Sequence, residues 1–285
     1  MSTQKFLSWE GTVDWLVTQP DQQELVRACY YDRPIEKSAE RFWRSEEWQA
    51  IRSYLPPSGG QALDIGAGAG IASYALAKDG WQVTALEPDN SESVGAGAIR
   101  RLSAISNLDI KVVQEFGESI AAADASFDLV HARQVLHHAR DLPQFCRELS
   151  RVLKPGGVLI TTRDHVISSP AQLPAFLDSH PLHRYYGGEN AFRLSEYKAA
   201  LRNAGLAIEE IIGPFDSVIN YAPFTRSSLR DALIIRASRI PGGSVLAKVI
   251  LADIWLDLVL KLLSRVDRRP GRPYSFLCRK PGSAP

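Results

Sequence analysis

The segment "QALDIGAGAGIASYAL", residues 61–76, decides the fold. A short apolar run ends in three glycines at alternate positions, Gly66, Gly68 and Gly70, and an alanine-rich stretch follows. This order indicates a strand, a tight turn and a helix. Glycines at such a turn let the backbone approach a ligand closely. Several classes of nucleotide-containing ligand bind at turns of this kind, and the glycine spacing separates them.

The spacing opposes two of these classes. In the dinucleotide-binding fingerprint the third glycine comes three residues after the second, where this chain has Ile71. The loop that binds nucleoside triphosphates needs a lysine directly after its last glycine, and the next lysine here is Lys78. Glu87 follows 19 residues after Gly68, where a carboxylate can accept both hydroxyl groups of a ribose. The turn therefore predicts a ligand with a ribose but without a pyrophosphate.

Beyond this segment, strand and helix patterns alternate. Apolar runs predict seven strands, at residues 61–65, 81–87, 109–115, 127–132, 158–163, 206–215 and 273–280. Helical spacing of apolar residues predicts helices at residues 69–78, 91–106, 141–153 and 193–205. Strands that alternate with helices form a mostly parallel sheet with helices on both faces, so we predict an α/β fold.

Composition sets only loose limits on function. The chain of 285 residues has a net charge of +1, which gives no overall attraction to nucleic acid. Residues 226–280 carry 12 basic and 4 acidic side chains, however, so this part is strongly basic. Three widely separated cysteines favour neither a disulfide framework nor a cysteine zinc site and fit a reducing compartment. With no signal-peptide or membrane-spanning pattern, we expect a cytoplasmic protein.

Four motifs make the sequence similar to one family. They are "ALDIGAGAG", "ALEPD", "SFDLVHARQVLHHARDL" and "LSRVLKPGGVLITTR". In order and spacing they resemble the class I S-adenosylmethionine-dependent methyltransferases, over about residues 61–213 and the final strand. The resemblance implies a Rossmann-like seven-stranded, mostly parallel sheet with helices on both faces. It also implies S-adenosyl-L-methionine as the cofactor and transfer of a methyl group to a small-molecule acceptor.

The same resemblance implies positions for the cofactor. The predicted binding residues are Asp64, Gly66, Ala67, Gly68, Glu87, Pro88, Phe116, Gly117, Glu118 and Arg133. The first four would lie against the methionine portion, Glu87 would hold the ribose, and Pro88 would lie beside the adenine. Many relatives place an aspartate after the third strand to meet the adenine amino group, and this chain has Phe116 there. The aromatic ring can lie against the adenine, with Glu118 or the backbone near Gly117 replacing the aspartate.

These patterns divide the chain into four parts. We predict an N-terminal helical extension (1–57), a cofactor-binding core (58–219), a helical insertion (220–270), and a last strand with a tail (271–285). Within the core, residues 166–190 contain irregular, turn-rich sequence and are expected to form a cap on the acceptor side.

Histidines mark the expected acceptor side. All six lie after the fourth or fifth strand or in the cap: His131, His137, His138, His165, His180 and His183. A hydroxyl acceptor must lose a proton, and histidine titrates near neutral pH. His165 is the preferred base because it directly follows the fifth strand, and His183 and His137 are further catalytic candidates. We therefore predict methylation of a small molecule at a hydroxyl oxygen.

Other interpretations stay open. His165, His180, His183 and Glu189 make a conceivable metal site, but an HxxH spacing in a loop is a weak signature, and we expect no metal. A non-catalytic cofactor-binding subunit that serves a partner is an alternative function. So is an N- or C-methyltransferase, because one fold hosts many acceptors.

The segment 245–272 combines a helical pattern with a broad apolar surface. A single helix would gather Asp253, Asp257, Lys261 and Ser264 on one narrow stripe. Its apolar face must be covered, either by the core, by a second subunit in a homodimer, or by a membrane surface. For peripheral membrane contact, anionic head groups would meet the arginines that follow, which are Arg265, Arg268, Arg269 and Arg272.

Overall fold

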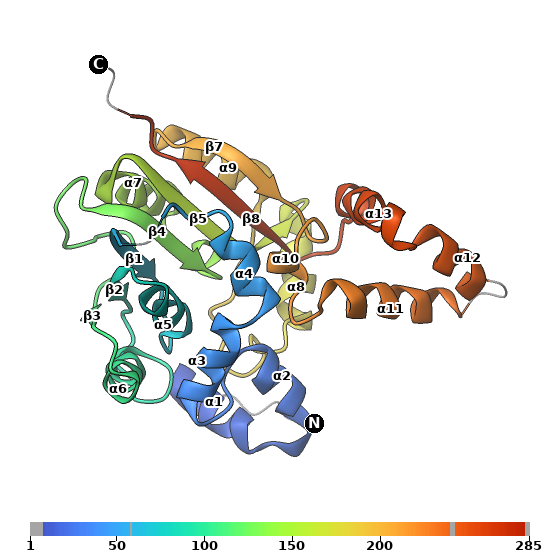
Figure 1. The fold of residues 1–285 in the computed structure, drawn as a ribbon, viewed down its shortest axis with the longest axis horizontal. Helices are drawn as coiled ribbons and strands as arrows, with labels where there is room; N and C mark the ends of the chain where they lie inside the picture. Colours follow the sequence, from blue (N-terminus) through green and yellow to red (C-terminus); the bar gives the residue numbers. More distant parts are fainter. Residues whose placement is uncertain (1–7, 58, 240–242, 283–285) are drawn as a thin grey trace.

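A central β-sheet organises the protein in a computed structural model that describes residues 8–57, 59–239 and 243–282. Its strands are β1 (Gln61–Ile65), β2 (Gln82–Leu86), β3 (Ile110–Val113), β4 (Phe127–Arg133), β5 (Leu153–Ile167), β6 (Phe192–Arg193), β7 (Ala207–Ile212) and β8 (Arg272–Arg279). They lie in the order β3-β2-β1-β4-β5-β8-β7, with β6 paired to the end of β5 (Figure 1). β8 runs antiparallel to both of its neighbours, β5 and β7, and the other strand pairs of the described sheet are parallel. The predicted α/β fold and its seven strands are confirmed, and the two-residue β6 is an addition.

Helices cover both faces of the sheet, as strands that are apolar throughout require. One face packs on α7 (Leu142–Val152) and α9 (Leu194–Asn203), which contact each other. The other face packs on α5 (Ile71–Lys78), α4 (Glu46–Arg52) and α10 (Val218–Tyr221). α6 (Ala96–Ser106) lies beside β3 at the edge. Because β1, β2, β4 and β5 are parallel, their carboxyl ends meet at one edge, where such folds bind ligands.

Asp79 is one of the carboxylates that anchor the N-terminal extension to the core. It contains α1 (Trp9–Thr18), α2 (Gln23–Ala28), α3 (Ile35–Trp43) and α4, with a short 3-10 turn, η1 (Pro20–Gln22), between the first two. Asp79, at the end of α5, accepts hydrogen bonds from the indoles of Trp43 and Trp48, at 2.7 and 2.9 Å, and from Arg52. α3 ends at Trp43, and the Ser45 side chain caps the start of α4. Asp79 thus joins α3 and α4 to the end of α5.

Two segments near the acceptor side differ from the sequence prediction. β5 does not end at Arg163 but continues to Ile167 after an irregularity, at which Arg163 has a φ of +62°. His165 therefore lies within a strand and not after it. The expected irregular cap, 166–190, contains a 3-10 turn, η3 (Pro170–Gln172), and a helix, α8 (Leu173–Ser179).

The predicted insertion forms an arm that projects from the sheet (Figure 1). We define the arm as α11 (Arg226–Ala237), α12 (Gly243–Ile250) and α13 (Asp253–Val266). The prediction of a single helix over 245–264 is wrong. A turn at residues 251–252 separates two helices, α12 and α13. Asp253 and Asp257 of the expected polar stripe pair with Arg226 of α11 at the surface, whereas α13 is buried through Leu256, Leu260 and Ser264.

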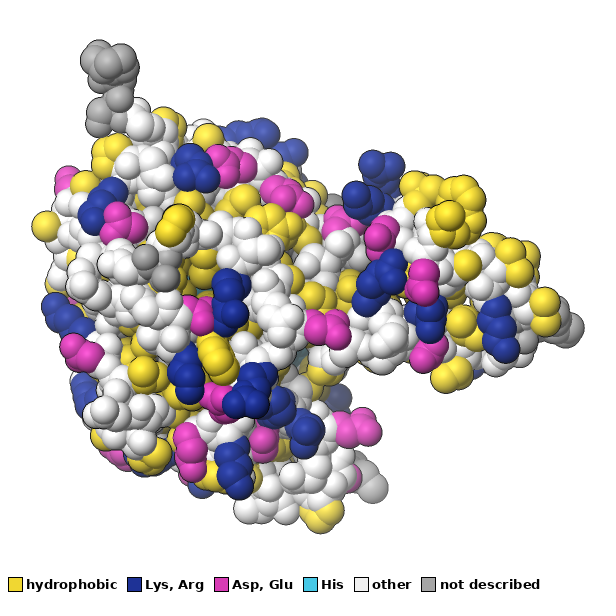
Figure 2. Space-filling model, viewed as in Figure 1, with side chains coloured by type: hydrophobic (Ala, Val, Ile, Leu, Met, Phe, Trp, Pro, Cys, Tyr) yellow, Lys and Arg dark blue, Asp and Glu magenta, His cyan; other side chains and the backbone are white. Residues whose placement is uncertain are grey.

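Much of the arm's apolar surface is uncovered by the described chain. Its exposed apolar residues are Ile235, Val245, Leu246, Val249, Ile250, Ile254, Trp255, Leu258, Leu262 and Val266. Figure 2 shows such side chains gathered on the outer side of the arm. Within the described residues, no helix combines the length and apolar character needed to cross a membrane.

Candidate active site

The glycine turn between β1 and α5 is open toward the carboxyl edge of the sheet. Gly66, Gly68 and Gly70 have φ values of +61°, +54° and +82°, which L side chains rarely adopt. A Cβ on Gly66 would lie 2.5 Å from a methyl group of Val135, so packing also requires glycine there. At Gly68 the nearest described atom to such a Cβ, the carbonyl oxygen of Val94, is 3.9 Å away. Gly68 therefore has free space above its backbone, into which a ligand can fit.

Glu87 closes this space from the end of β2. Its carboxylate accepts hydrogen bonds from the amides of Gly68, at 2.7 Å, and Asp89, at 2.9 Å. Burial raises the pKa of the Glu87 carboxyl, and the hydrogen bonds from the two backbone amides oppose that rise. The next residue, Pro88, is exposed. The sequence thus places a carboxylate directly against the glycine turn, where a ribose is expected.

Asp64 lies deeper than a ligand contact would require. It is 1% exposed, and its carboxylate accepts from the Ser73 hydroxyl at 2.6 Å and meets Nδ1 of His131 at 2.9 Å. Both carboxylate oxygens are therefore engaged by the protein. Asp64 thus supports the glycine turn from within the protein, and the Ala67 amide in that turn donates a hydrogen bond to the carbonyl oxygen of Leu86.

The expected adenine subsite is at the surface after β3. The Phe116 ring is 56% exposed, with the Arg140 guanidinium 5.2 Å from its centroid. Gly117 packs on Phe145, since an added Cβ would approach that ring to 2.1 Å. The Glu118 carboxylate accepts from the Arg140 amide at 2.9 Å. An aromatic face is thus available to a base, while Glu118 is turned toward the residues that precede α7.

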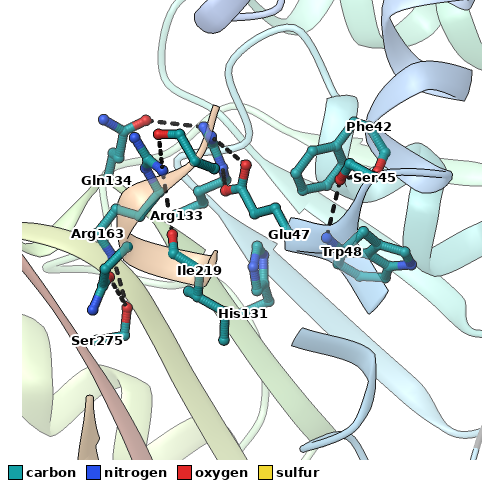
Figure 3. A network of polar contacts seen from close by, with 12 residues as sticks. Phe42, Ser45, Glu47, Trp48, His131, Arg133, Gln134, Arg163, Ile219 and Ser275 are labelled. Carbon is teal, nitrogen blue, oxygen red and sulfur yellow. Dashed lines mark hydrogen bonds and ion pairs between the residues drawn. The ribbon is translucent and has the colours of Figure 1, made fainter. Parts of the chain in front are cut away.

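Arg133, at the end of β4, belongs to a partly buried polar network (Figure 3). It donates to Glu47 of α4 at 2.9 Å and to the side chain of Gln134 at 2.9 Å. Nearby, Arg163 donates to the backbone oxygens of Ile219 and Ala222, and among the described residues its Nε has no partner. Burial lowers the pKa of Arg163. Two guanidinium groups near one carboxylate give this corner of the site an excess of positive charge.

His137 is held rigidly beside the end of β5. It lies in a 3-10 turn, η2 (Leu136–His138), and is 1% exposed. Its Nδ1 donates to Asp164 Oδ1 at 3.1 Å, and its backbone amide donates to the same oxygen at 3.2 Å. The other ring nitrogen, Nε2, faces Glu189 Oε2 at 3.5 Å. Asp164 and Glu189 therefore bracket one imidazole.

His165 presents a free ring nitrogen to the same carboxylate. Its Nδ1 lies 3.0 Å from the carbonyl oxygen of Gly271, which can only accept, so Nδ1 is the donor. Nε2 is then available as an acceptor when the ring is neutral, and it lies 3.9 Å from Glu189 Oε2. The rings of His137 and His165 are 4.5 Å apart, and Phe176 covers His165 on another side.

The two imidazoles have opposite electrostatic surroundings. Burial disfavours charge on His137, but the hydrogen bond to Asp164 and the nearby charge of Glu189 outweigh burial and raise its pKa to about 9. Burial, together with the nearby charge of His137, holds the pKa of His165 well below its ordinary value. Burial opposes charge on Glu189, but the nearby His137, His180 and His138 lower its pKa to about 2. At neutral pH His165 is the uncharged member.

The remaining histidines have mixed positions. His180 approaches Glu189 Oε1 at 3.8 Å through Nδ1, which also accepts the backbone amide of His183. His183 Nδ1 is buried without a partner among the described residues. His138 donates to the oxygen of Gly188. His131 is a correction to the expected clustering, because it is buried in β4 against Asp64 and not on the acceptor side.

Sequence reasoning missed Asp164 and Arg163. Arg163 lies at the irregularity in β5, and Asp164 directly follows it. A charged "TTRDH" run after an apolar strand was the available signal for both.

Comparison with known proteins identifies the family. Residues 63–161 match a family described as "Methyltransferase domain". A ubiquinone biosynthesis O-methyltransferase from Xanthomonas axonopodis pv. citri (strain 306) is 32% identical over 171 residues, which cover 57% of this chain and 69% of that protein. The chain belongs to the class I S-adenosylmethionine-dependent methyltransferases. The predicted cofactor is thereby confirmed as S-adenosyl-L-methionine.

Similar methyltransferases act at different atoms. A dimethylglycine N-methyltransferase from Parasynechococcus marenigrum (strain WH8102) is 38% identical over 108 residues, which cover 37% of this chain and 38% of that protein. The crystal structure of a geranyl diphosphate C-methyltransferase from Streptomyces coelicolor A3(2) has a TM-score of 0.58 and 14% identity, and covers 94% of this chain and 87% of that one. That likeness concerns the fold alone.

The residues of this methyltransferase fit the cofactor. The space above the Gly68 backbone is free to hold part of a ligand, and the Glu87 carboxylate lies beside it. Bound there, S-adenosyl-L-methionine supplies a methyl group already activated by a positively charged sulfur. What remains for the protein is to align the acceptor and to manage its proton.

Proposed function

We propose that this methyltransferase acts on a hydroxyl oxygen of a small molecule. The main support for this proposal is the cluster formed by His137, His165 and Glu189 at the carboxyl ends of β4 and β5. A hydroxyl oxygen must lose its proton as the new carbon–oxygen bond forms, and a neutral imidazole with a free Nε2 suits that loss. His165 offers such an atom, because Gly271 fixes the proton on Nδ1.

The roles follow from position. Glu87 binds the ribose, Gly68 allows close backbone approach, and the exposed Phe116 ring lies against the adenine. The positive corner formed by Arg133 and Arg163 suits an anionic group of the cofactor or acceptor. The histidine cluster then receives the acceptor hydroxyl.

An acceptor panel tests this proposal. Purified protein is incubated with S-adenosyl-L-methionine and a matched series of catechols, simple phenols, amines and carbon nucleophiles, and S-adenosylhomocysteine release is measured. Turnover of hydroxyl compounds, with the methyl group located on oxygen by mass spectrometry, supports the proposal. Turnover only with amines or carbon nucleophiles overturns it in favour of N- or C-methylation. Cofactor binding without turnover of any acceptor favours the non-catalytic alternative.

We also propose that the arm contacts an anionic membrane surface, which suits a lipid-linked acceptor. Its outer apolar residues, such as Ile254 and Leu258, have no cover within the described chain. At 100° per residue, Lys261 and Arg265 lie along one edge of this strip, and both are exposed. An apolar strip edged by basic side chains matches the depth profile of an anionic interface. Arg272 does not contribute, because it is buried and donates to backbone oxygens of Val166 and Arg269.

Vesicle co-sedimentation tests the arm. We expect salt-sensitive binding to vesicles with phosphatidylserine, weaker binding to phosphatidylcholine alone, and loss of both after Ile254→Asp with Leu258→Asp. Ile105→Asp is the matched control, since this exposed apolar residue lies on α6 outside the arm. A dimer that the arm variant dissociates, with no vesicle binding, would assign the face to a second copy instead.

A further inference from the structure

Three potential metal ligands converge on the acceptor side. One potential ligand atom from each of His137, His165 and Glu189 lies within 4.8 Å of the other two. Glu189 Oε2 lies 3.5 Å from Nε2 of His137 and 3.9 Å from Nε2 of His165. A tetrahedral zinc site with bonds of about 2.0–2.1 Å has ligand–ligand edges of roughly 3.3 Å, so only small side-chain shifts separate this arrangement from a coordinating one.

Both imidazoles are oriented as metal-binding histidines are. In metal sites the second ring nitrogen usually donates to a carboxylate or a backbone carbonyl, which fixes the tautomer and directs the free nitrogen to the ion. His137 Nδ1 bonds to Asp164, and His165 Nδ1 bonds to the Gly271 oxygen. These two supports come from different parts of the chain, yet both direct Nε2 to the same carboxylate. The cluster therefore contains the outer partners of a metal site as well as its ligands.

Glu189 supplies the second, independent observation. Its Oε2 is buried, and no hydrogen bond to it exists within the described part of the chain. Asp164 Oδ2 is buried and unpaired in the same way. Ionised, the two carboxylates carry two negative charges in one buried cluster. A divalent cation bound at Glu189 Oε2 would balance both charges and occupy the unpaired oxygen.

We propose that His137, His165 and Glu189 bind a divalent first-row transition-metal ion, with a further coordination position open to the acceptor hydroxyl. A set of two histidines and one carboxylate is typical of zinc, iron and manganese sites that keep an open position. This inference deepens the proposed hydroxyl methylation and rests on it for its catalytic consequence. A coordinated hydroxyl loses its proton more readily, with the proton passing to solvent, and no electron transfer is involved. His165 then acts by holding the ion, and the sequence-based expectation of no metal is replaced.

The proposed ligands differ from the metal site considered from the sequence, which combined His165, His180, His183 and Glu189. His137 takes the place of His183, whose Nδ1 is buried and whose backbone contacts His180. His180 is a neighbour and not a ligand through Nδ1, because that atom accepts a backbone hydrogen bond.

Metal titration tests the proposal without any acceptor or turnover. Tag-free protein is stripped with a chelator, and Zn²⁺ and Co²⁺ binding are measured by calorimetry, with the cobalt absorption spectrum as a report on ligand geometry. We expect one saturable ion per chain and a tetrahedral or five-coordinate cobalt spectrum. Glu189→Gln and His165→Gln should each weaken binding by at least about 10–100-fold, the range that loss of even an outer partner produces.

The matched control is His138→Gln. This imidazole is 4.1 Å from the His137 ring but donates to Gly188 and is not in the ligand set, so its loss should leave ion affinity unchanged. Retained S-adenosylhomocysteine binding shows that each variant is folded. Absence of saturable binding in the wild type, or equal binding in all variants, overturns the metal site. Because no acceptor is present, that result is separate from the acceptor panel: hydroxyl methylation without an ion would leave His165 as the base itself.

Discussion

Replacing Gly68 with alanine should weaken cofactor binding while leaving the protein folded. At φ +54° any L residue is strained by about 1–2 kcal/mol, but the added methyl meets nothing closer than 3.9 Å within the described protein. The folded state should therefore persist, with a melting temperature a few degrees lower. The methyl would occupy the space assigned to the cofactor. Overpacking by one methyl costs about 1–3 kcal/mol, which corresponds to roughly 5- to 150-fold weaker binding.

Calorimetry with S-adenosylhomocysteine measures this loss, and Gly156→Ala is its control. Gly156 has a similar φ, +79°, and no described atom lies within 4 Å of its added Cβ. It precedes the central part of β5 at the opposite edge of the sheet, so it shares the backbone strain but not the ligand. Equal affinity in the Gly68→Ala and Gly156→Ala variants would refute the placement of the cofactor on the glycine turn. Gly66→Ala should instead damage folding, because its Cβ overlaps Val135 at 2.5 Å.

Three further changes probe the site. Glu87→Ala removes charged hydrogen bonds worth about 1.5–3 kcal/mol each, so S-adenosylhomocysteine should bind at least tenfold more weakly in calorimetry, whereas Asp109→Ala, exposed before β3, should not differ from wild type. His165→Ala should lower kcat by about 10²–10⁴-fold with cofactor affinity retained; near-normal turnover would remove this residue from the mechanism. In metal-free protein, the raised pKa of His137, about 9, means that its stabilisation is complete below about 6.5 and is lost as pH rises through 9. The difference in melting temperature between wild type and His137→Gln should shrink over that range, and a constant difference would contradict the assigned protonation.

The cofactor side could be predicted from local sequence because its geometry is local. The turn needs glycine at φ values that other residues avoid, and the carboxylate that contacts it ends the next strand. Gly68 and Glu87 are 19 residues apart, within one strand–helix–strand unit. The methyltransferase fold and the cofactor follow from such units in order. The adenine subsite departs from the family pattern at Phe116, and its role stays a prediction.

The arm shows where pattern reasoning fails. A helical pattern over residues 245–264 does not reveal a break at 251–252, because apolar residues continue through it. Nor does the pattern tell which side of α13 faces the protein. Leu256 and Leu260 face the rest of the arm, while Asp253 and Asp257 pair with Arg226 at the surface. Ile254 and Leu258 on the same helix remain exposed.

The acceptor side could not be predicted because its parts meet only in three dimensions. His137 and Asp164 are 27 residues apart, and His165 is oriented by a carbonyl 106 residues away. A glycine is required at that distant point, since a Cβ on Gly271 would lie 2.1 Å from the Phe176 ring, which itself packs on His165. The histidine content indicated proton chemistry, but only the direction of each Nε2 distinguishes a lone base from a shared cluster. Both nitrogens point to Glu189, a residue from the cap, and for that reason the inference moves from a single histidine to three ligands acting together.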